Sequence, residues 1–358
     1  MDRALSQLCE TVRAASASRA PLCIRAGGTK DFYGNAPQGT LFDPRSVAGV
    51  VEYEPTELVI TARAGTSLAE LEQLLTDNGQ MLAFEPPHFG TDATIGGCIA
   101  AGLAGPRRAS FGPTYGGVRD FVLGAKLVDG RGELLSFGGT VMKNVAGYDV
   151  SRLLAGSMGI LGVIVEVSLK VLPRPLSHHT LRLEMPAART LDKLNEWAGR
   201  PLPLSASVWH DGVLHLRLAG AAAAVMAARR ELGGENVDNS QADILWASVR
   251  EQTHPFFGGE APLWRMSVPA SAGCLSVSGA QLIEWNGALR WLRTEQNAVP
   301  IRACAGEAGG HATLFRGGDR SAGVFTPLAA PLAAIHQRLK AQFDPAGIFN
   351  RGRLYPEL

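Results

Sequence analysis

The sequence has no excess of charge of either sign. Lysine and arginine total 34 and aspartate and glutamate 33, so the 358 residues carry a formal net charge of +1. Because nucleic acid is bound mainly through clustered positive charge, this balance argues against nucleic acid as a partner. Charged residues make up 19%, below the usual ~25%, which agrees with a surface partly covered by a partner protein.

Long apolar runs are missing too. The longest, such as residues 218–228, are shorter than the ~18 residues that span a membrane, and acidic residues flank the start where a signal peptide would be apolar. The five cysteines are widely spaced and contain no Cys-x-x-Cys pair, which suits reduced thiols and excludes the usual iron–sulfur spacings. We therefore predict a cytoplasmic protein without a membrane span, in contact with the inner membrane only through partner subunits.

Metal and nucleotide motifs are lacking as well. His178 and His179 are adjacent and His210 and His215 are five apart, so on a single strand each pair would point to opposite faces. No Gly-x-x-x-x-Gly-Lys-Ser/Thr loop is found, and no Gly-x-Gly-x-x-Gly follows a strand. The sequence thus predicts no metal site and neither Walker-type nucleotide hydrolysis nor an ordinary Rossmann fold.

Glycine, by contrast, is abundant, at 42 residues, and 17 of these lie between Gly90 and Gly162. Such a density weighs against helix or strand interiors, because glycine loses the most conformational entropy on ordering. Hairpin turns account for residues 129–132 and 138–139. Turns do not explain the runs 95–105 and 156–162. For these we predict backbone that adopts left-handed angles or lies close to a ligand.

The remaining patterns alternate between strand and helix. Strands are predicted over 21–25, 58–64 and 163–171, and Ser67 with Glu70 forms a capping box that opens a helix. After residue 175 the pattern favours a second α+β unit. Its predicted strands are 180–183, 207–209, 213–218, 263–268 and 273–278, and its predicted helices are 187–198 and 221–232. A final helix covers 327–343. We expect three parts: 1–173 (lobes about 1–55 and 56–173), 174–326 and 327–358.

Two glycine-rich loops follow strands and suit a long, flat dinucleotide. Residues 25–31 can form a nest of backbone N–H groups that faces an anion, and residues 96–105 offer backbone without bulky side chains. Each loop alone is equally consistent with a plain structural turn. Their combination points to a pyrophosphate held between them.

The order of these motifs resembles the vanillyl-alcohol-oxidase, or PCMH-type, FAD-binding family. The resemblance rests on segments 25–29, 86–87, 93–100, 147–150, 156–164 and 343–354. More narrowly, segments 85–90 and 141–149 resemble the FAD-binding subunits of bacterial glycolate oxidases. The family implies an α+β fold: a PCMH-type FAD-binding domain of two α/β subdomains, plus a smaller α+β cap domain with an antiparallel sheet.

The resemblance also implies which residues contact FAD: Gly27, Gly28, Thr29, Lys30, Asp31, Thr94, Gly96, Gly97, Ala100, Ala101, Gly105, Ser110, Tyr115, Gly159, Ile160 and Ile164. In some members of the family a histidine at the position of Thr29 is joined covalently to the flavin. Threonine cannot form that bond, so we predict non-covalent FAD.

Oxidation of a 2-hydroxy acid needs a cation for the carboxylate and a base for the hydroxyl proton. Arg265 lies in an apolar, strand-like stretch and is the predicted clamp, although an ordinary strand arginine is an equal alternative. His311 in a glycine-flanked segment is the predicted base, and a plain loop histidine is the alternative. His88 could face the cofactor, and Lys143 or Arg353 could place positive charge near the flavin.

The resemblance implies an FAD-binding subunit that oxidises glycolate to glyoxylate, or that relays electrons while a second flavoprotein subunit does the chemistry. Because no iron–sulfur motif is present, an iron–sulfur subunit is an expected further partner. Two alternatives stay open: a stand-alone dehydrogenase for a D-lactate-like D-2-hydroxy acid, and a non-catalytic assembly subunit.

Overall fold

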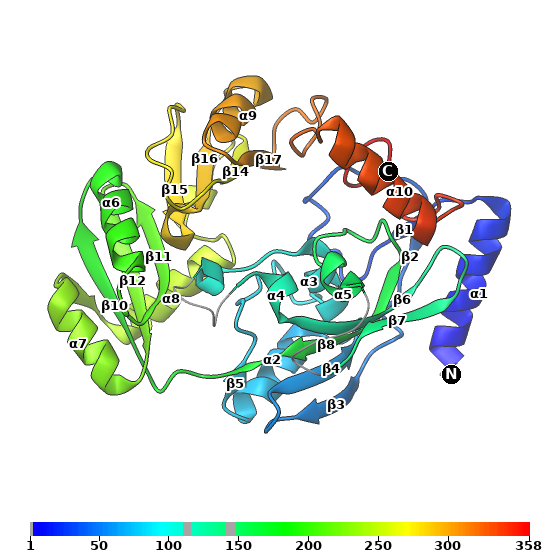
Figure 1. Ribbon diagram of the computed structural model, residues 1–358, viewed down its shortest axis with the longest axis horizontal. Helices are drawn as coiled ribbons and strands as arrows, with labels where there is room; N and C mark the ends of the chain where they lie inside the picture. Colours follow the sequence, from blue (N-terminus) through cyan, green and yellow to red (C-terminus); the bar gives the residue numbers. More distant parts are fainter. Residues whose placement is uncertain (1–2, 110–115, 141–147) are drawn as a thin grey trace.

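The computed structural model describes residues 3–109, 116–140 and 148–358. Helices and strands form two units side by side (Figure 1), one made of the N-terminal residues and the C-terminal tail, the other of the central strands. Both large sheets are antiparallel. The predicted α+β class with an antiparallel cap sheet is confirmed.

The first unit is built on a five-stranded sheet of order β3-β4-β8-β6-β7. Its strands are β3 (Val50–Glu54), β4 (Val59–Arg63), β6 (Val122–Val128), β7 (Leu134–Gly138) and β8 (Val163–Lys170). The helices that lie between them in the sequence are α2 (Leu68–Asp77), α3 (Ile95–Ala101), α4 (Val118–Phe121) and α5 (Val150–Leu153). The predicted cap is confirmed, since the Ser67 hydroxyl accepts a hydrogen bond from the Glu70 backbone at the start of α2. Leu68, Leu71 and Leu75 are then buried in the largest core of the protein.

The two ends of the chain meet in a second core. Helix α1 (Arg3–Ser18), the parallel pair β1 (Leu22–Ile24) and β2 (Thr40–Phe42), and buried residues of the tail after α10 (Ala330–Phe343) pack together. The buried Lys340 ammonium donates to the carbonyls of Ile160 and Phe349 at 2.7 and 2.8 Å and pairs with Asp344 at 2.7 Å. A short pair, β5 (Gln80–Met81) with β9 (Leu172–Pro173), precedes the connection to the second unit.

The second unit, called the cap below, is an eight-stranded sheet of order β13-β10-β12-β11-β15-β16-β14-β17. Its strands are β10 (Ser177–Glu184), β11 (Leu204–His210), β12 (Val213–Gly220), β13 (Glu235–Val237), β14 (Leu263–Ser267), β15 (Ala280–Glu284), β16 (Leu289–Arg293) and β17 (His311–Arg316). One face packs on α6 (Ala187–Ala198), α7 (Ala222–Leu232) and α9 (Ala298–Glu307). The other face packs on α8 (Asn239–Arg250) and on residues of the first unit. Single 3-10 turns are η1 (Pro106–Ala109), η2 (Pro255–Phe257) and η3 (Trp285–Gly287).

Three expectations from the sequence are wrong. Residues 273–278 form no strand, although Leu275 and Val277 pack on the core beneath α9. Residues 95–101 form the helix α3 despite their glycines. His210 and His215 share a sheet face, because the hairpin pairs Val208 with His215 and His210 lies two residues beyond Val208. The domain limits 1–173, 174–326 and 327–358 stay a prediction.

Candidate functional site

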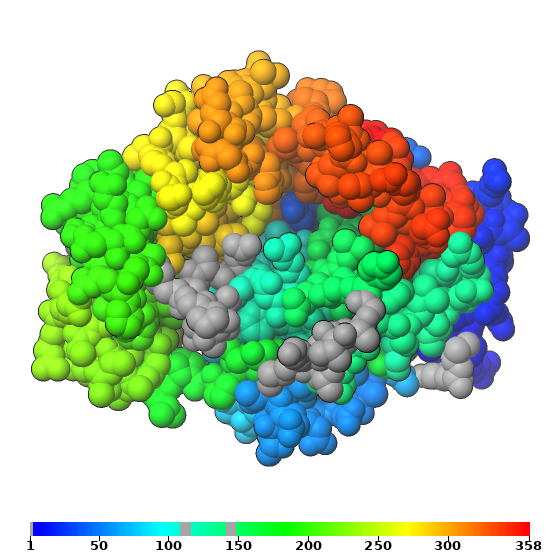
Figure 2. Space-filling model, viewed as in Figure 1, coloured from blue at the N-terminus to red at the C-terminus, as the bar shows by residue number. Residues whose placement is uncertain are grey.

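A cavity of about 330 Å³ opens between segments that are far apart in the sequence. Figure 2 shows the surface hollowed between the C-terminal elements and the residues that precede β8. Twelve of the predicted cofactor residues line this cavity: Gly27, Gly28, Thr29, Lys30, Asp31, Thr94, Gly96, Gly97, Ala100, Ala101, Gly159 and Ile164. The two glycine-rich loops therefore face one another across a single space.

The first loop presents backbone donors to this space. Gly28 has φ +69°, and within the described part of the chain nothing accepts a hydrogen bond from the N–H groups of residues 27–30. A Cβ on Gly27 would lie 1.6 Å from the carbonyl oxygen of Asp92, so only glycine fits there. Successive unpaired N–H groups in such a turn form an anion-binding nest, as a pyrophosphate requires.

The second loop supplies a smooth wall. Thr94 caps α3, and its hydroxyl accepts a hydrogen bond from the Gly97 N–H at 3.1 Å. A Cβ on Gly96 would lie 2.6 Å from the Cβ of Ala64, so glycine lets α3 pack closely on the end of β4. The short helix thus places Gly97, Ala100 and Ala101 along the cavity without a bulky side chain.

The C-terminal segments complete the cavity. Asn350 accepts a hydrogen bond from the Ile24 N–H and donates one to the Met158 carbonyl, both at 2.7 Å. Arg353 donates to the Asn35 carbonyl at 2.9 Å, and Arg320 lines the same space. Burial lowers the pKa of the Arg353 guanidinium. Arg353 was a candidate for positive charge near the flavin; the roles of Asn350 and Arg320 were missed.

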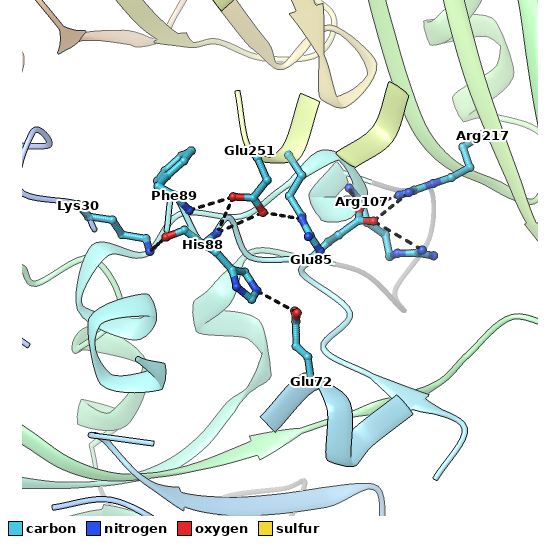
Figure 3. A network of polar contacts seen from close by, with 9 residues as sticks. Lys30, Glu72, Glu85, His88, Phe89, Arg107, Arg217 and Glu251 are labelled. Atoms are coloured by element: carbon cyan, nitrogen blue, oxygen red, sulfur yellow. Dashed lines mark hydrogen bonds and ion pairs between the residues drawn. The ribbon is translucent and has the colours of Figure 1, made fainter. Parts of the chain in front are cut away.

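The Lys30 side chain contacts both Thr29 of the nest and the loop 85–90. Its ammonium donates to the Thr29 hydroxyl at 3.3 Å and to the His88 carbonyl at 3.2 Å, and it lies 5.6 Å from the centre of the Phe89 ring (Figure 3). Burial lowers the pKa of this ammonium. Lys30 therefore connects the nest to the loop 85–90.

The loop 85–90 is held by carboxylates that bridge the two units (Figure 3). Glu251, just after α8, accepts hydrogen bonds from the backbone N–H groups of His88 and Phe89. The Glu85 carboxylate accepts hydrogen bonds from both terminal nitrogens of Arg217, a residue of β12, at 2.9 and 2.7 Å. His88 points to Glu72 of α2 at 2.9 Å rather than into the main cavity. This network fixes the cap against the cavity, and no sequence pattern had indicated it.

Arg265 and His311 lie on the cap face that meets the first unit. Arg265 lies 5.2 Å from the centre of the Trp285 ring, and no described residue accepts a hydrogen bond from its guanidinium. It lines a separate cavity of about 20 Å³ together with Gly105 and Glu284. His311 is exposed at the start of β17 and lines neither space; desolvation and the Arg265 charge lower its pKa.

The remaining predicted residues lie elsewhere. The buried Ile160 accepts the Lys340 hydrogen bond through its carbonyl, and it does not line the main cavity. Ser110, Tyr115 and Lys143 lie outside the described residues. Within the described ranges, no group of three or more His, Cys, Asp or Glu residues is arranged to hold a metal ion. Nor is any helix there long and apolar enough to cross a membrane.

Glu284 is a buried carboxyl that the sequence did not single out. It accepts a hydrogen bond from the Trp291 indole at 2.7 Å, and burial raises its pKa to about 7 from 4.5. The folded protein therefore keeps a proton between pH 4.5 and 7 that the unfolded chain releases. This carboxyl makes the folded state less stable as the pH rises through that window.

We expect Glu284→Gln to raise the free energy of unfolding at pH 8 by about 3 kcal/mol, and to leave it nearly unchanged at pH 4.5. The amide oxygen can still accept from Trp291, and it carries no charge to desolvate. Urea unfolding at both pH values measures the difference, with the exposed Glu57→Gln as control. Equal or lower stability of Glu284→Gln at pH 8 would contradict the expectation.

Comparison with known proteins supports an FAD-binding fold for this chain. The family described as FAD binding domain matches residues 3–152. Solved structures of alkyldihydroxyacetonephosphate synthase share the fold, with a TM-score of 0.66 over 96% of this chain and 74% of theirs, at 15% identity. The fold and site thus define an FAD-binding protein of the PCMH type.

The chain is 49% identical over 351 residues to glycolate oxidase subunit GlcE of Escherichia coli K12, covering 98% of this chain and 97% of that protein. It belongs to the family of this subunit, within the FAD-dependent oxidoreductases. Glycolate oxidase subunit GlcD of Bacillus subtilis is 31% identical over 46% of this chain and 35% of its own length. A D-lactate dehydrogenase of Archaeoglobus fulgidus is 31% identical over 52% of this chain and 41% of its own.

Proposed function

We propose that this chain is the FAD-carrying subunit of a complex that oxidises glycolate to glyoxylate. The proposal draws on the similarity to the GlcE subunit and on one observation. No described residue accepts a hydrogen bond from the Arg265 guanidinium, which lies on the cap face that meets the FAD-binding unit. A desolvated guanidinium is a strong binder of a carboxylate, because its donors form two parallel hydrogen bonds.

The residues present fit FAD. The nest at residues 27–30 would hold the pyrophosphate, and the wall at Gly97 and Ala100, which has no side chain larger than a methyl group, would hold the flat ring system. Thr29 lines the cavity and offers no atom for a covalent link of the histidine type, so we propose non-covalent attachment. When bound, FAD accepts the hydride from C2 of the substrate.

Arg265 would bind the substrate carboxylate, and His311 would take the hydroxyl proton as the hydride leaves. Desolvation and the Arg265 charge lower the pKa of His311, so the neutral imidazole is free to accept a proton near neutral pH. The products are then glyoxylate, a protonated base and reduced cofactor, which balances the proton and the two electrons.

A second candidate, electron relay within the complex, is favoured by the cavity beside Arg265. Its volume of about 20 Å³ holds roughly one water molecule, and a 2-hydroxy acid would need the cap to move. In this version a GlcD-like flavoprotein oxidises the substrate, and an iron–sulfur subunit passes the electrons on. We propose both partners from the subunit character of the relatives and from the cysteine pattern.

Anaerobic glycolate, added to the FAD-loaded protein, distinguishes these roles. We expect bleaching of the flavin absorbance, and a rate about 100-fold lower in Arg265→Met, since loss of a bidentate charge-assisted contact costs roughly 3 kcal/mol. The exposed Arg119→Met is the control. Bleaching only after the partner subunits are added, and unchanged in Arg265→Met, would favour the relay. A protein that takes up no FAD would refute both versions.

A further inference from the structure

A second cavity, of about 280 Å³, lies at the junction of the FAD-binding unit and the cap. Four arginines line it: Arg107 and Arg174 from the first unit, and Arg217 and Arg250 from the cap. It shares no lining residue with the FAD cavity. We call it the arginine cleft.

Two of these arginines share one carboxylate. The Arg217 side chain, 7% exposed, is held by Glu85 on both terminal nitrogens and by the Ser205 hydroxyl at 3.2 Å. Arg107 lies 4.0 Å from the same Glu85, and its backbone N–H donates to that carboxylate at 3.1 Å. Burial alone would raise the pKa of Glu85, but the charges of Arg217, Arg107 and Arg250 outweigh it and lower the pKa to about 2. Glu85 therefore pairs with both Arg217 and Arg107, so one carboxylate faces two guanidinium charges.

The other cations of the cleft also face few free carboxylates. Arg250 pairs with Glu251, which lies outside the cleft lining, at 2.8 Å. No described residue accepts a hydrogen bond from the Arg174 guanidinium. Of the two remaining carboxylates, Glu72 is engaged by His88 at 2.9 Å. The other, Asp243, lies 3.9 Å from His178 and is 74% exposed at the mouth.

We propose that the arginine cleft binds a small dianion, a dicarboxylate or a phosphate, between the FAD-binding unit and the cap. Its volume suits a compact molecule rather than a polymer, and a guanidinium matches the planar oxygen pairs of such anions. The site is separate from the FAD cavity and does not depend on the proposed glycolate oxidation.

Such an anion would tie the two units together. Arg174 follows β9, on the connection that leads into the cap, whereas Arg250 ends α8 of the cap. A ligand held by both would resist separation of the units, so binding should raise the melting temperature as well as give heat on titration.

The test uses the FAD-loaded chain, so that the nest at residues 27–30 is occupied. Malonate and inorganic phosphate are titrated separately by calorimetry and in thermal unfolding, against sodium chloride at equal ionic strength. We expect saturable binding of at least one probe, and an affinity at least tenfold lower in Arg174→Gln, which removes one charge-assisted contact. Arg174 is exposed, so its replacement should not unfold the protein.

Arg189→Gln, an exposed arginine of α6 outside the cleft, is the matched control and should bind like the wild type. Saturation by malonate alone would assign a dicarboxylate site, and by phosphate alone a phosphate site. The proposal is overturned if neither probe exceeds the chloride effect, or if Arg174→Gln binds as tightly as Arg189→Gln.

Discussion

Gly27→Ala is expected to abolish FAD binding, with a dissociation constant raised more than 100-fold. The added Cβ would lie 1.6 Å from the Asp92 carbonyl oxygen and 2.5 Å from its carbon. Backbone cannot swing aside as a flexible side chain can, so the loop 27–31 must move and the N–H groups of the nest lose their common direction. The visible spectrum after gel filtration, with a fluorescence titration of FAD, measures the loss.

Two further variants make this result interpretable. Gly273→Ala adds a Cβ that meets nothing within 4 Å and should keep the flavin. Gly97→Leu directs a side chain into the cavity, where only the Thr94 hydroxyl lies near the new Cβ, at 3.2 Å, so it should block FAD and leave the circular dichroism unchanged. FAD binding by both Gly27→Ala and Gly97→Leu within tenfold of the wild type would rule out this cavity as the cofactor site.

Glu85→Ala is expected to lower the free energy of unfolding at pH 7 by about 3–5 kcal/mol, because it leaves the buried Arg217 without its counter-charge. The pKa of Glu85 falls to about 2 in the folded protein from 4.5 when unfolded. Its contribution is therefore complete above pH 4.5 and is lost as the pH falls toward 2. The gap between wild type and variant in urea unfolding should shrink over that interval.

Removal of both partners provides the internal check. Glu85→Ala combined with Arg217→Ala should be more stable than Glu85→Ala alone, since no uncompensated charge remains buried. The exposed Glu57→Ala should change stability by less than about 0.5 kcal/mol. A loss below about 1 kcal/mol in Glu85→Ala would mean that this pair does little to hold the cap in place.

The sequence predicted correctly the helices and strands that depend on residues close together in the chain. The helix cap at Ser67 and the strands near residues 22, 59 and 163 follow from side chains a few positions apart. The loops at residues 27 and 96 were predicted to face one ligand, and both line one cavity. Their glycines could be read as sites of close approach without knowledge of the neighbouring element.

Contacts between distant segments were not predictable in the same way. Glu251 lies 163 residues from His88 and 162 from Phe89, and the resemblance of segment 85–90 gave no sign of a contact with Glu251. The helix α3 was missed because its glycines lower helix propensity, whereas close packing of Gly96 on Ala64 compensates in the fold. The shared face of His210 and His215 depends on the hairpin at residues 211–212, which an analysis of one strand at a time could not include.

The tail that closes the cavity has a consequence for biosynthesis. Arg320, Asn350 and Arg353 line the same space as the nest, and Asn350 bonds the backbone of both Ile24 and Met158. A nascent chain of 300 residues contains the nest and the wall formed by α3, but it lacks these three cavity residues. The cavity that we assign to the flavin is therefore complete only after residues 320–353 have folded onto the first unit.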